Sequence, residues 1–114
     1  MEELFQAIEA LNISKVEELL VNGANPNTIN PIYYNYPHLE YQPYSPLRLI
    51  VFYLSDALLE EEDYEKLYKL TVILLKHGAD PKKAIELAEL RYGKVDLTHE
   101  SPANKVLNEL YKAV

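Results

Sequence analysis

Apolar residues recur at spacings of three and four along most of the chain, which is the periodicity of amphipathic helices. The first such stripe, within residues 2–11, consists of Leu4, Phe5, Ala7, Ile8 and Leu11. Ser14 follows as a predicted N-cap, Glu17 completes a capping box, and Gly23 ends the second helix. Two short helices joined by two or three residues lie antiparallel, so residues 2–27 are predicted to form a helical hairpin.

Three more helix starts are marked by a capping residue followed by proline, at Ser45–Pro46, Asp80–Pro81 and Ser101–Pro102. The helix from residue 46 is apolar nearly all round, which predicts that it is the most buried. An acidic run at residues 60–63 is expected to form an exposed turn before the next helix, which ends at Gly78. The pattern predicts an all-α fold in one domain, with six helices in three pairs at about residues 2–27, 45–80 and 81–113.

Residues 28–44 interrupt the helical pattern. Their prolines, at positions 31, 37 and 43, exclude a continuous helix. Five of the ten tyrosines lie in this segment: Tyr33, Tyr34, Tyr36, Tyr41 and Tyr44. Tyrosine favours extended strands, and proline limits how they pair. We therefore expect an extended hairpin, or finger, at about residues 28–44, with Tyr44 packed in the core.

One short pattern occurs twice, at residues 18–26 and 73–81, and both copies read Leu-Leu-x-x-Gly-Ala, then Asn or Asp, then Pro. This pattern resembles the end of an ankyrin repeat, where the second helix closes on a glycine. Residues 45–49, Ser-Pro-Leu-Arg-Leu, are similar to the Thr-Pro-Leu-His box that opens such a repeat, and Asn27 resembles the asparagine after its Gly-Ala turn. The resemblance implies an ankyrin-repeat-like α-solenoid of about three stacked units that recognises a protein without catalysis.

The chain departs from the family pattern in three respects. Gly23 and Gly78 are 55 positions apart, although the family repeat has about 33 residues. Arg48 stands where the family has histidine, and the third pair lacks a closing Gly-Ala motif. The family's binding residues are therefore not transferred to this sequence.

The formal net charge is −7, from 18 acidic and 11 basic side chains. Nucleic acids and anionic membranes require a basic face, so both are excluded as expected partners. The charge favours a basic protein partner, although solubility alone is its preferred explanation. The chain has no cysteine, no apolar run of transmembrane length and no signal-peptide pattern at its acidic start. We expect a cytoplasmic monomer.

Motifs for catalysis or metal binding are missing from the sequence. The three histidines, His38, His77 and His99, lie far apart without ligand spacing, and no serine lies in a Gly-x-Ser-x-Gly turn. We therefore expect no catalytic residue, no metal site, no cofactor and no enzyme activity. A small hydrolase is the alternative, and it would require a pocket with a histidine and a carboxylate within hydrogen-bonding reach.

The predicted partner-binding residues belong to the finger and to the acidic run: Tyr33, Tyr34, Tyr36, His38, Tyr41, Glu60, Glu61, Glu62 and Asp63. Tyrosines provide large, rigid contact areas and are enriched in interface hot spots. The alternative is that the rings fold back onto the protein's own surface, and that the acidic run is only a solvated turn.

Three roles fit these features: a general protein-interaction module that binds through the finger and a concave face, an immunity or antitoxin-like inhibitor of a basic enzyme such as a nuclease, and a host-directed effector or adaptor. The acidic charge and small size motivate the inhibitor, which we would expect to be encoded beside its target.

Overall fold

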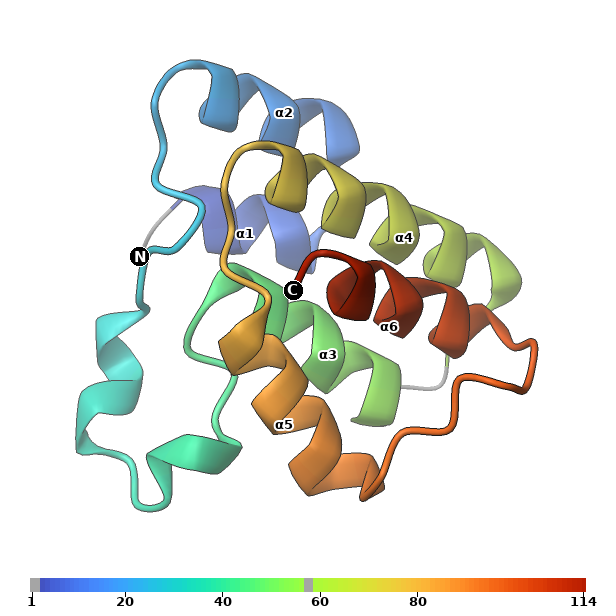
Figure 1. Ribbon diagram of the computed structural model, residues 1–114. Coiled ribbons are helices and arrows are strands. Elements are labelled where there is room, and N and C mark those ends of the chain that lie inside the picture. The colour runs from blue at the N-terminus through green and yellow to red at the C-terminus, as the bar shows by residue number, and fades with distance from the viewer. Residues whose placement is uncertain (1–2, 57–58) are drawn as a thin grey trace.

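The computed structural model describes residues 3–56 and 59–114, and the predicted first unit begins just outside this range, at residue 2 (Figure 1). Within the described residues the chain is helical and has no strand, which confirms the all-α prediction. The α-helices are α1 (Glu3–Glu9), α2 (Ile13–Val21), α3 (Pro46–Asp56), α4 (Glu61–Lys76), α5 (Lys82–Tyr92) and α6 (Pro102–Lys112). Two short 3-10 helices, η1 (Pro31–Asn35) and η2 (Leu39–Tyr41), lie between α2 and α3.

The six helices lie in two rows. Helices α1, α3 and α5 contact one another in series, and so do α2, α4 and α6 (Figure 1). Contacts between the rows join α1 to α2, α3 to α4 and α5 to α6. The radius of gyration is 13.2 Å, which is the value expected for a compact chain of this length.

The hydrophobic core fills the space between the rows. Helix α3 provides a large share of it, as its apolar sequence predicts, and α4 adds three fully buried leucines, Leu67, Leu70 and Leu74. Thr71 is buried among them, and its hydroxyl donates a hydrogen bond to the carbonyl of Leu67 (2.8 Å), which satisfies the polar group. Amphipathic helices of this length gain most of their stability from such packing.

The two copies of the Gly-Ala pattern fold in the same way. Gly23 and Gly78 adopt φ angles of 99° and 96°, a conformation that a side chain would strain. The amide of Ala24 donates to the carbonyl of Leu19 (2.9 Å), and the amide of the equivalent Ala79 donates to Leu74 (3.0 Å). These bonds close α2 and α4 as Schellman motifs, so the sequence repeat is also a structural repeat.

Asn27 joins the two Gly-Ala turns. Its amide nitrogen donates to the carbonyl of Gly78 (3.0 Å), and its amide oxygen accepts from the backbone N–H of Asp80 (2.7 Å). One side chain thereby satisfies two backbone groups of a turn that lies more than fifty residues away in the sequence. The contact fixes the end of α2 beside the end of α4.

The start of α2 differs from the prediction. Ser14 lies inside the first turn, and the N-cap is Asn12, whose side chain accepts from the N–H of Lys15 (3.1 Å). The reason lies in the preceding residue, because Leu11 takes a left-handed conformation (φ 53°) and ends α1 abruptly. Asn12 is then the first residue available as a cap, and asparagine caps helices as well as serine does.

The predicted proline starts are confirmed for α3 and α6, whose first residues are Pro46 and Pro102. Helix α5 begins one residue later than predicted, at Lys82, because Pro81 occupies the N-cap position. The carboxylate of Asp80 accepts from the N–H of Lys82 (2.9 Å) and so satisfies the first free amide of the helix.

Candidate functional site

Residues 30–44, named here the tyrosine loop, form a closed loop. The amide of Asn30 donates to the carbonyl of Tyr44 (2.8 Å), and this bond joins the two ends. The side chain of Asn30, which is only 4% exposed, also accepts from the N–H of Ile32 and thereby caps η1. The predicted extended hairpin is therefore wrong, because capping and proline at the first position of η1 favour tight 3-10 turns over strand pairing.

Arg48 of α3 holds the inner side of the tyrosine loop. Its guanidinium group donates to the backbone carbonyl of Glu40 and lies over the ring of Tyr44, 4.3 Å from the ring centroid. Helix η2 in addition contacts α5. The loop is thus anchored to the row formed by α1, α3 and α5.

Most rings of the tyrosine loop face outward. Tyr34 is 63% exposed, and Tyr36 and Tyr41 are about half exposed. Tyr33 is half-buried and packs edge-to-face against Tyr36, with 4.9 Å between the ring centroids. Tyr44 is half-buried beneath Arg48 and is not part of the hydrophobic core, so the core position predicted for it is wrong.

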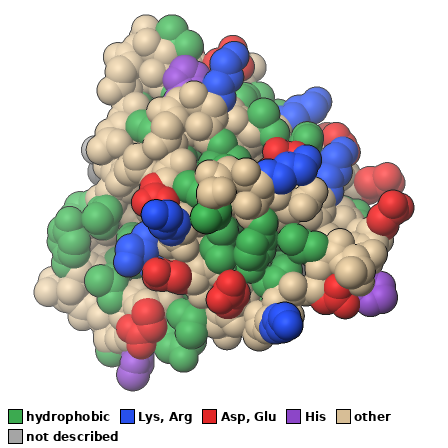
Figure 2. All heavy atoms as spheres, in the orientation of Figure 1, with side chains coloured by type: hydrophobic (Ala, Val, Ile, Leu, Met, Phe, Trp, Pro, Cys, Tyr) green, Lys and Arg blue, Asp and Glu red, His purple; other side chains and the backbone are tan. Residues whose placement is uncertain are grey.

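We name the exposed apolar side chains of this loop the tyrosine surface; they are Ile32, Tyr34, Tyr36, Leu39 and Tyr41. Figure 2 shows hydrophobic side chains gathered over this part of the chain, at the left edge of the molecule. Exposed large apolar side chains that cluster on one loop are typical of protein-interaction sites. The alternative that these rings fold back into the protein does not apply to this surface.

His38 lies at the bend between η1 and η2. It has a left-handed backbone (φ 56°), and its ring is exposed beside Tyr41 and 3.7 Å from the Glu40 carboxylate. This position allows contact with a partner. No group of three metal-ligating side chains occurs among the described residues.

The predicted acidic turn is the beginning of α4. The carboxylate of Asp63 accepts from the N–H of Glu60 (3.1 Å), and the helix begins at Glu61. Acidic side chains stabilise a helix N-terminus because they interact favourably with its dipole, so the run has a local structural role. Glu60, Glu61 and Glu62 are nevertheless exposed, and Glu62 forms an ion pair with Lys66 (3.1 Å).

The structure does not bring the two predicted groups of binding residues together. Figure 1 places the tyrosine loop at the left edge and the start of α4 at the right edge of the molecule. A single compact contact area therefore cannot contain both. They are two separate surfaces.

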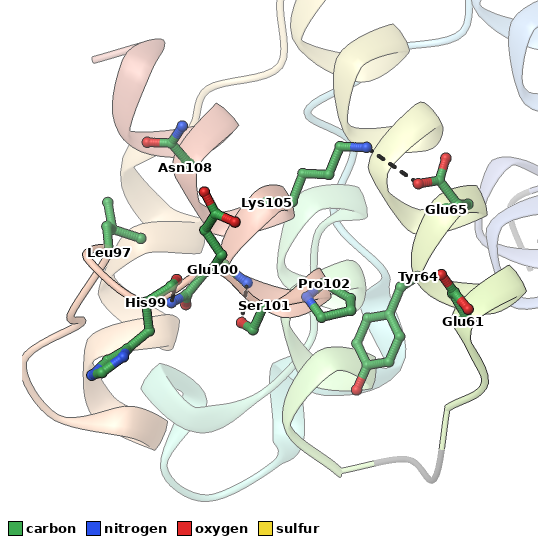
Figure 3. A pocket seen from close by; sticks show the side chains of 11 residues that line it. Glu61, Tyr64, Glu65, Leu97, His99, Glu100, Ser101, Pro102, Lys105 and Asn108 are labelled. Carbon is green, nitrogen blue, oxygen red and sulfur yellow. Dashed lines mark hydrogen bonds and ion pairs between the residues drawn. The ribbon is translucent and has the colours of Figure 1, made fainter.

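An open pocket of about 550 Å³ lies between the start of α4, the start of α6 and the preceding loop. Its lining includes Glu61, Tyr64, Glu65 and Lys105, and Lys105 forms an ion pair with Glu65 (3.2 Å) (Figure 3). His99 also belongs to the lining, but its exposed ring points away from Tyr64 and Glu61 and lies 3.6 Å from Asp96. The histidine and the carboxylates of the pocket thus do not face one another as an acid–base pair would.

Two aromatic side chains of α3, Phe52 and Tyr53, are only half-buried, which the sequence analysis missed. Burial, then Glu9 and Tyr33, raise the pKa of Tyr53. The ring of Phe52 lies 6.3 Å from that of Tyr53, and the guanidinium of Arg91 lies 4.8 Å from the Phe52 centroid. The sequence of α3 is apolar on nearly every side. It therefore does not indicate which face of the helix remains accessible to solvent.

Comparison with protein-family models, with curated proteins and with solved structures finds no match to this chain. Within residues 3–56 and 59–114, no helix has both the length and the apolar character needed to cross a bilayer.

Proposed function

We propose that this chain is a non-catalytic protein-binding module and that the tyrosine surface is its main contact area. The proposal rests on one observation. The loop exposes aromatic rings to solvent, and hydrogen bonds hold its backbone in place. Tyr34, Tyr36 and Tyr41 present their rings to solvent, while hydrogen bonds and a buried arginine hold the loop behind them. Rings fixed before binding lose little conformational entropy when a partner docks, which favours affinity.

The proposed architecture is an ankyrin-like array of three helix pairs. Its support comes from the matching turns at Gly23 and Gly78, from the bridge that Asn27 forms between them, and from helix contacts that run in series along two rows. A helical hairpin cannot bury its apolar face alone, whereas neighbouring hairpins share one core. Protein recognition is the role that such arrays commonly have, and their fold alone does not fix it.

A basic partner fits the charge of the molecule. The net charge is −7, and Glu60, Glu61 and Glu62 are exposed at the end opposite the tyrosine loop. Such charges at the edge of a complex accelerate association more than they strengthen it. A stoichiometric inhibitor of a basic enzyme, such as a nuclease toxin, is the second role that this charge favours.

The proposal is tested by co-expression with the products of adjacent genes, followed by size-exclusion chromatography and titration calorimetry. The test variant carries Tyr34→Ala, Tyr36→Ala and Tyr41→Ala, and the control carries Val21→Ala and Val72→Ala, which remove exposed apolar groups from α2 and α4. We expect a 1:1 complex for the wild type and the control. The triple variant should raise Kd at least about thirtyfold, because hot-spot tyrosines contribute about 2 kcal/mol or more.

Circular dichroism establishes that both variants keep the wild-type helix content. A triple variant that is folded and binds with unchanged Kd would contradict the proposed surface. For the inhibitor role, the association rate should fall steeply as salt is added. An association rate that does not depend on salt would exclude charge-guided binding to a basic enzyme.

A further inference from the structure

Arg48 is the largest fully buried side chain of the described residues, with 1% of its surface exposed. Removing a charged guanidinium from water is unfavourable unless hydrogen bonds or an opposite charge replace the lost hydration. No carboxylate forms an ion pair with Arg48 within the described part of the chain, and its Nε atom has no hydrogen-bond partner. The burial of this charge therefore needs an explanation other than an ion pair.

Both groups that hold the guanidinium belong to the tyrosine loop. They are the backbone carbonyl of Glu40, the middle residue of η2, and the ring of Tyr44 at the end of the loop. If the loop moved away, Arg48 would lose both contacts together. The buried charge thus links the closed loop to α3, because only this conformation gives the guanidinium its partners.

An apolar side chain at position 48 would suit the core at least as well. Apolar residues often replace buried charged groups without loss of stability, and Glu40 as a residue is exposed. We therefore expect the helices to stay packed when an apolar residue replaces this arginine. We expect Arg48 to affect mainly the conformation of the tyrosine loop.

We propose that Arg48 is a positioning residue that keeps the tyrosine surface in its binding conformation. This inference rests on the proposed function of that surface. Without Arg48, the loop would populate open conformations, and only the closed fraction would bind. Apparent affinity falls in proportion to that fraction.

The first test needs no partner and measures amide hydrogen exchange of the free protein by NMR. The amides of Tyr41 and Gln42 donate to the carbonyls of His38 and Leu39 (2.9 and 3.0 Å), so they report on η2. Arg48→Met should raise their exchange rates about tenfold, a size typical of a local opening equilibrium. The amides of Ala24 and Ala79, in the Gly-Ala turns, should exchange at wild-type rates.

Arg91→Met is the matched control, since Arg91 also lies over an aromatic ring and donates to Ser55, but it belongs to α5. It should leave Tyr41 and Gln42 protected. Unchanged exchange of these two amides in Arg48→Met would overturn the inference. An equal increase at Ala24 and Ala79 would also overturn it, because it would mean that Arg48 supports the whole fold.

The second test measures binding kinetics with the partner. Arg48→Met should slow association about tenfold and change dissociation less than about twofold, because the bound loop keeps its contacts. Arg48→Lys keeps a charge and a donor and should restore part of the rate. If Arg48→Met weakened affinity only by faster dissociation, this would contradict the positioning role of Arg48. If Tyr34→Ala, Tyr36→Ala and Tyr41→Ala leave binding intact, the proposed function fails, whatever the exchange rates show.

Discussion

The Gly-Ala turns and the tyrosine loop connect helices of the same molecule in different ways. At Gly23 and Gly78, a short sequence pattern determines the conformation, and it gives nearly the same φ angle and equivalent hydrogen bonds twice. The tyrosine loop has no such local pattern. Asn30 closes its ends and Arg48, from the next helix, holds its middle. Local backbone preference shapes the turns, and tertiary contacts shape the loop.

This difference separates the parts of the molecule that stabilise it from the part that we propose for binding. The turns end α2 and α4, and Asn27 bridges them. The loop exposes large rings that the fold does not need. Changes in the turns should therefore alter stability, and changes in the loop should alter recognition.

The largest expected effect on stability comes from replacing the glycines of the turns. Gly23→Ala and Gly78→Ala should each lower the free energy of unfolding by about 1–2 kcal/mol, because alanine is strained at positive φ. No atom lies within 4 Å of the added Cβ, so the loss is conformational and should be similar at both sites. Urea denaturation measures it, with Asn22→Ala, at negative φ, as the control. Very different losses would mean that the two turns are not equivalent.

Removing the bridge between the turns should have a smaller effect. Asn27→Ala deletes two hydrogen bonds to the backbone at Gly78 and Asp80, and we expect a loss of about 1 kcal/mol because the side chain is exposed. The amide of Asp80 should exchange faster in the variant. Asn108→Ala, on the exposed side of α6, provides the control and should leave both measurements unchanged. An unchanged exchange rate at Asp80 would show that the bridge contributes nothing in solution.

The smallest expected effect is a loss of stability at alkaline pH. Burial, then Tyr36, then Glu9 raise the pKa of Tyr33 in the loop, and burial, then the hydrogen bond to Glu89, raises that of Tyr111 in α6. A raised pKa in the folded state contributes stability below the unfolded value of about 10, and this contribution is lost as the pH rises through the folded value. Urea midpoints should therefore decrease above about pH 10.

The variants Tyr33→Phe and Tyr111→Phe separate the two regions in this measurement. Each should reduce the dependence of the urea midpoint on pH, because phenylalanine cannot ionise. Phenolate absorbance should follow the titration of the remaining tyrosines. A midpoint that is constant across this pH range would contradict the raised pKa values.

Sequence reasoning was most successful where the determinants are local. It found the helices, the glycine ends of α2 and α4 and the proline starts of α3 and α6. It failed at Ser14, where the left-handed Leu11 moved the cap to Asn12, and at residues 60–63, where an expected turn is the beginning of α4. Both errors concern which of several suitable residues caps a helix, and the geometry of the adjoining segment decides this.

The sequence predicted the tyrosines of the candidate site, but it did not predict the conformation of their backbone. Tyr34, Tyr36 and Tyr41 are exposed as a binding site requires, yet the predicted hairpin is a closed loop with two 3-10 helices. The partial exposure of Phe52 and Tyr53 was missed, because the sequence of α3 offers apolar residues on every side. Which of them remain accessible depends on where the other helices pack.

Residue spacing, caps and glycines alone determined that this chain forms short helices with two equivalent turns, since these preferences act over four or five residues. Only the tertiary structure decided that a buried arginine contacts a loop of outward-facing tyrosines, and that the acidic run at residues 60–63 lies at the opposite end of the molecule. Contacts between residues distant in sequence depend on how the helices pack, and no local pattern encodes them.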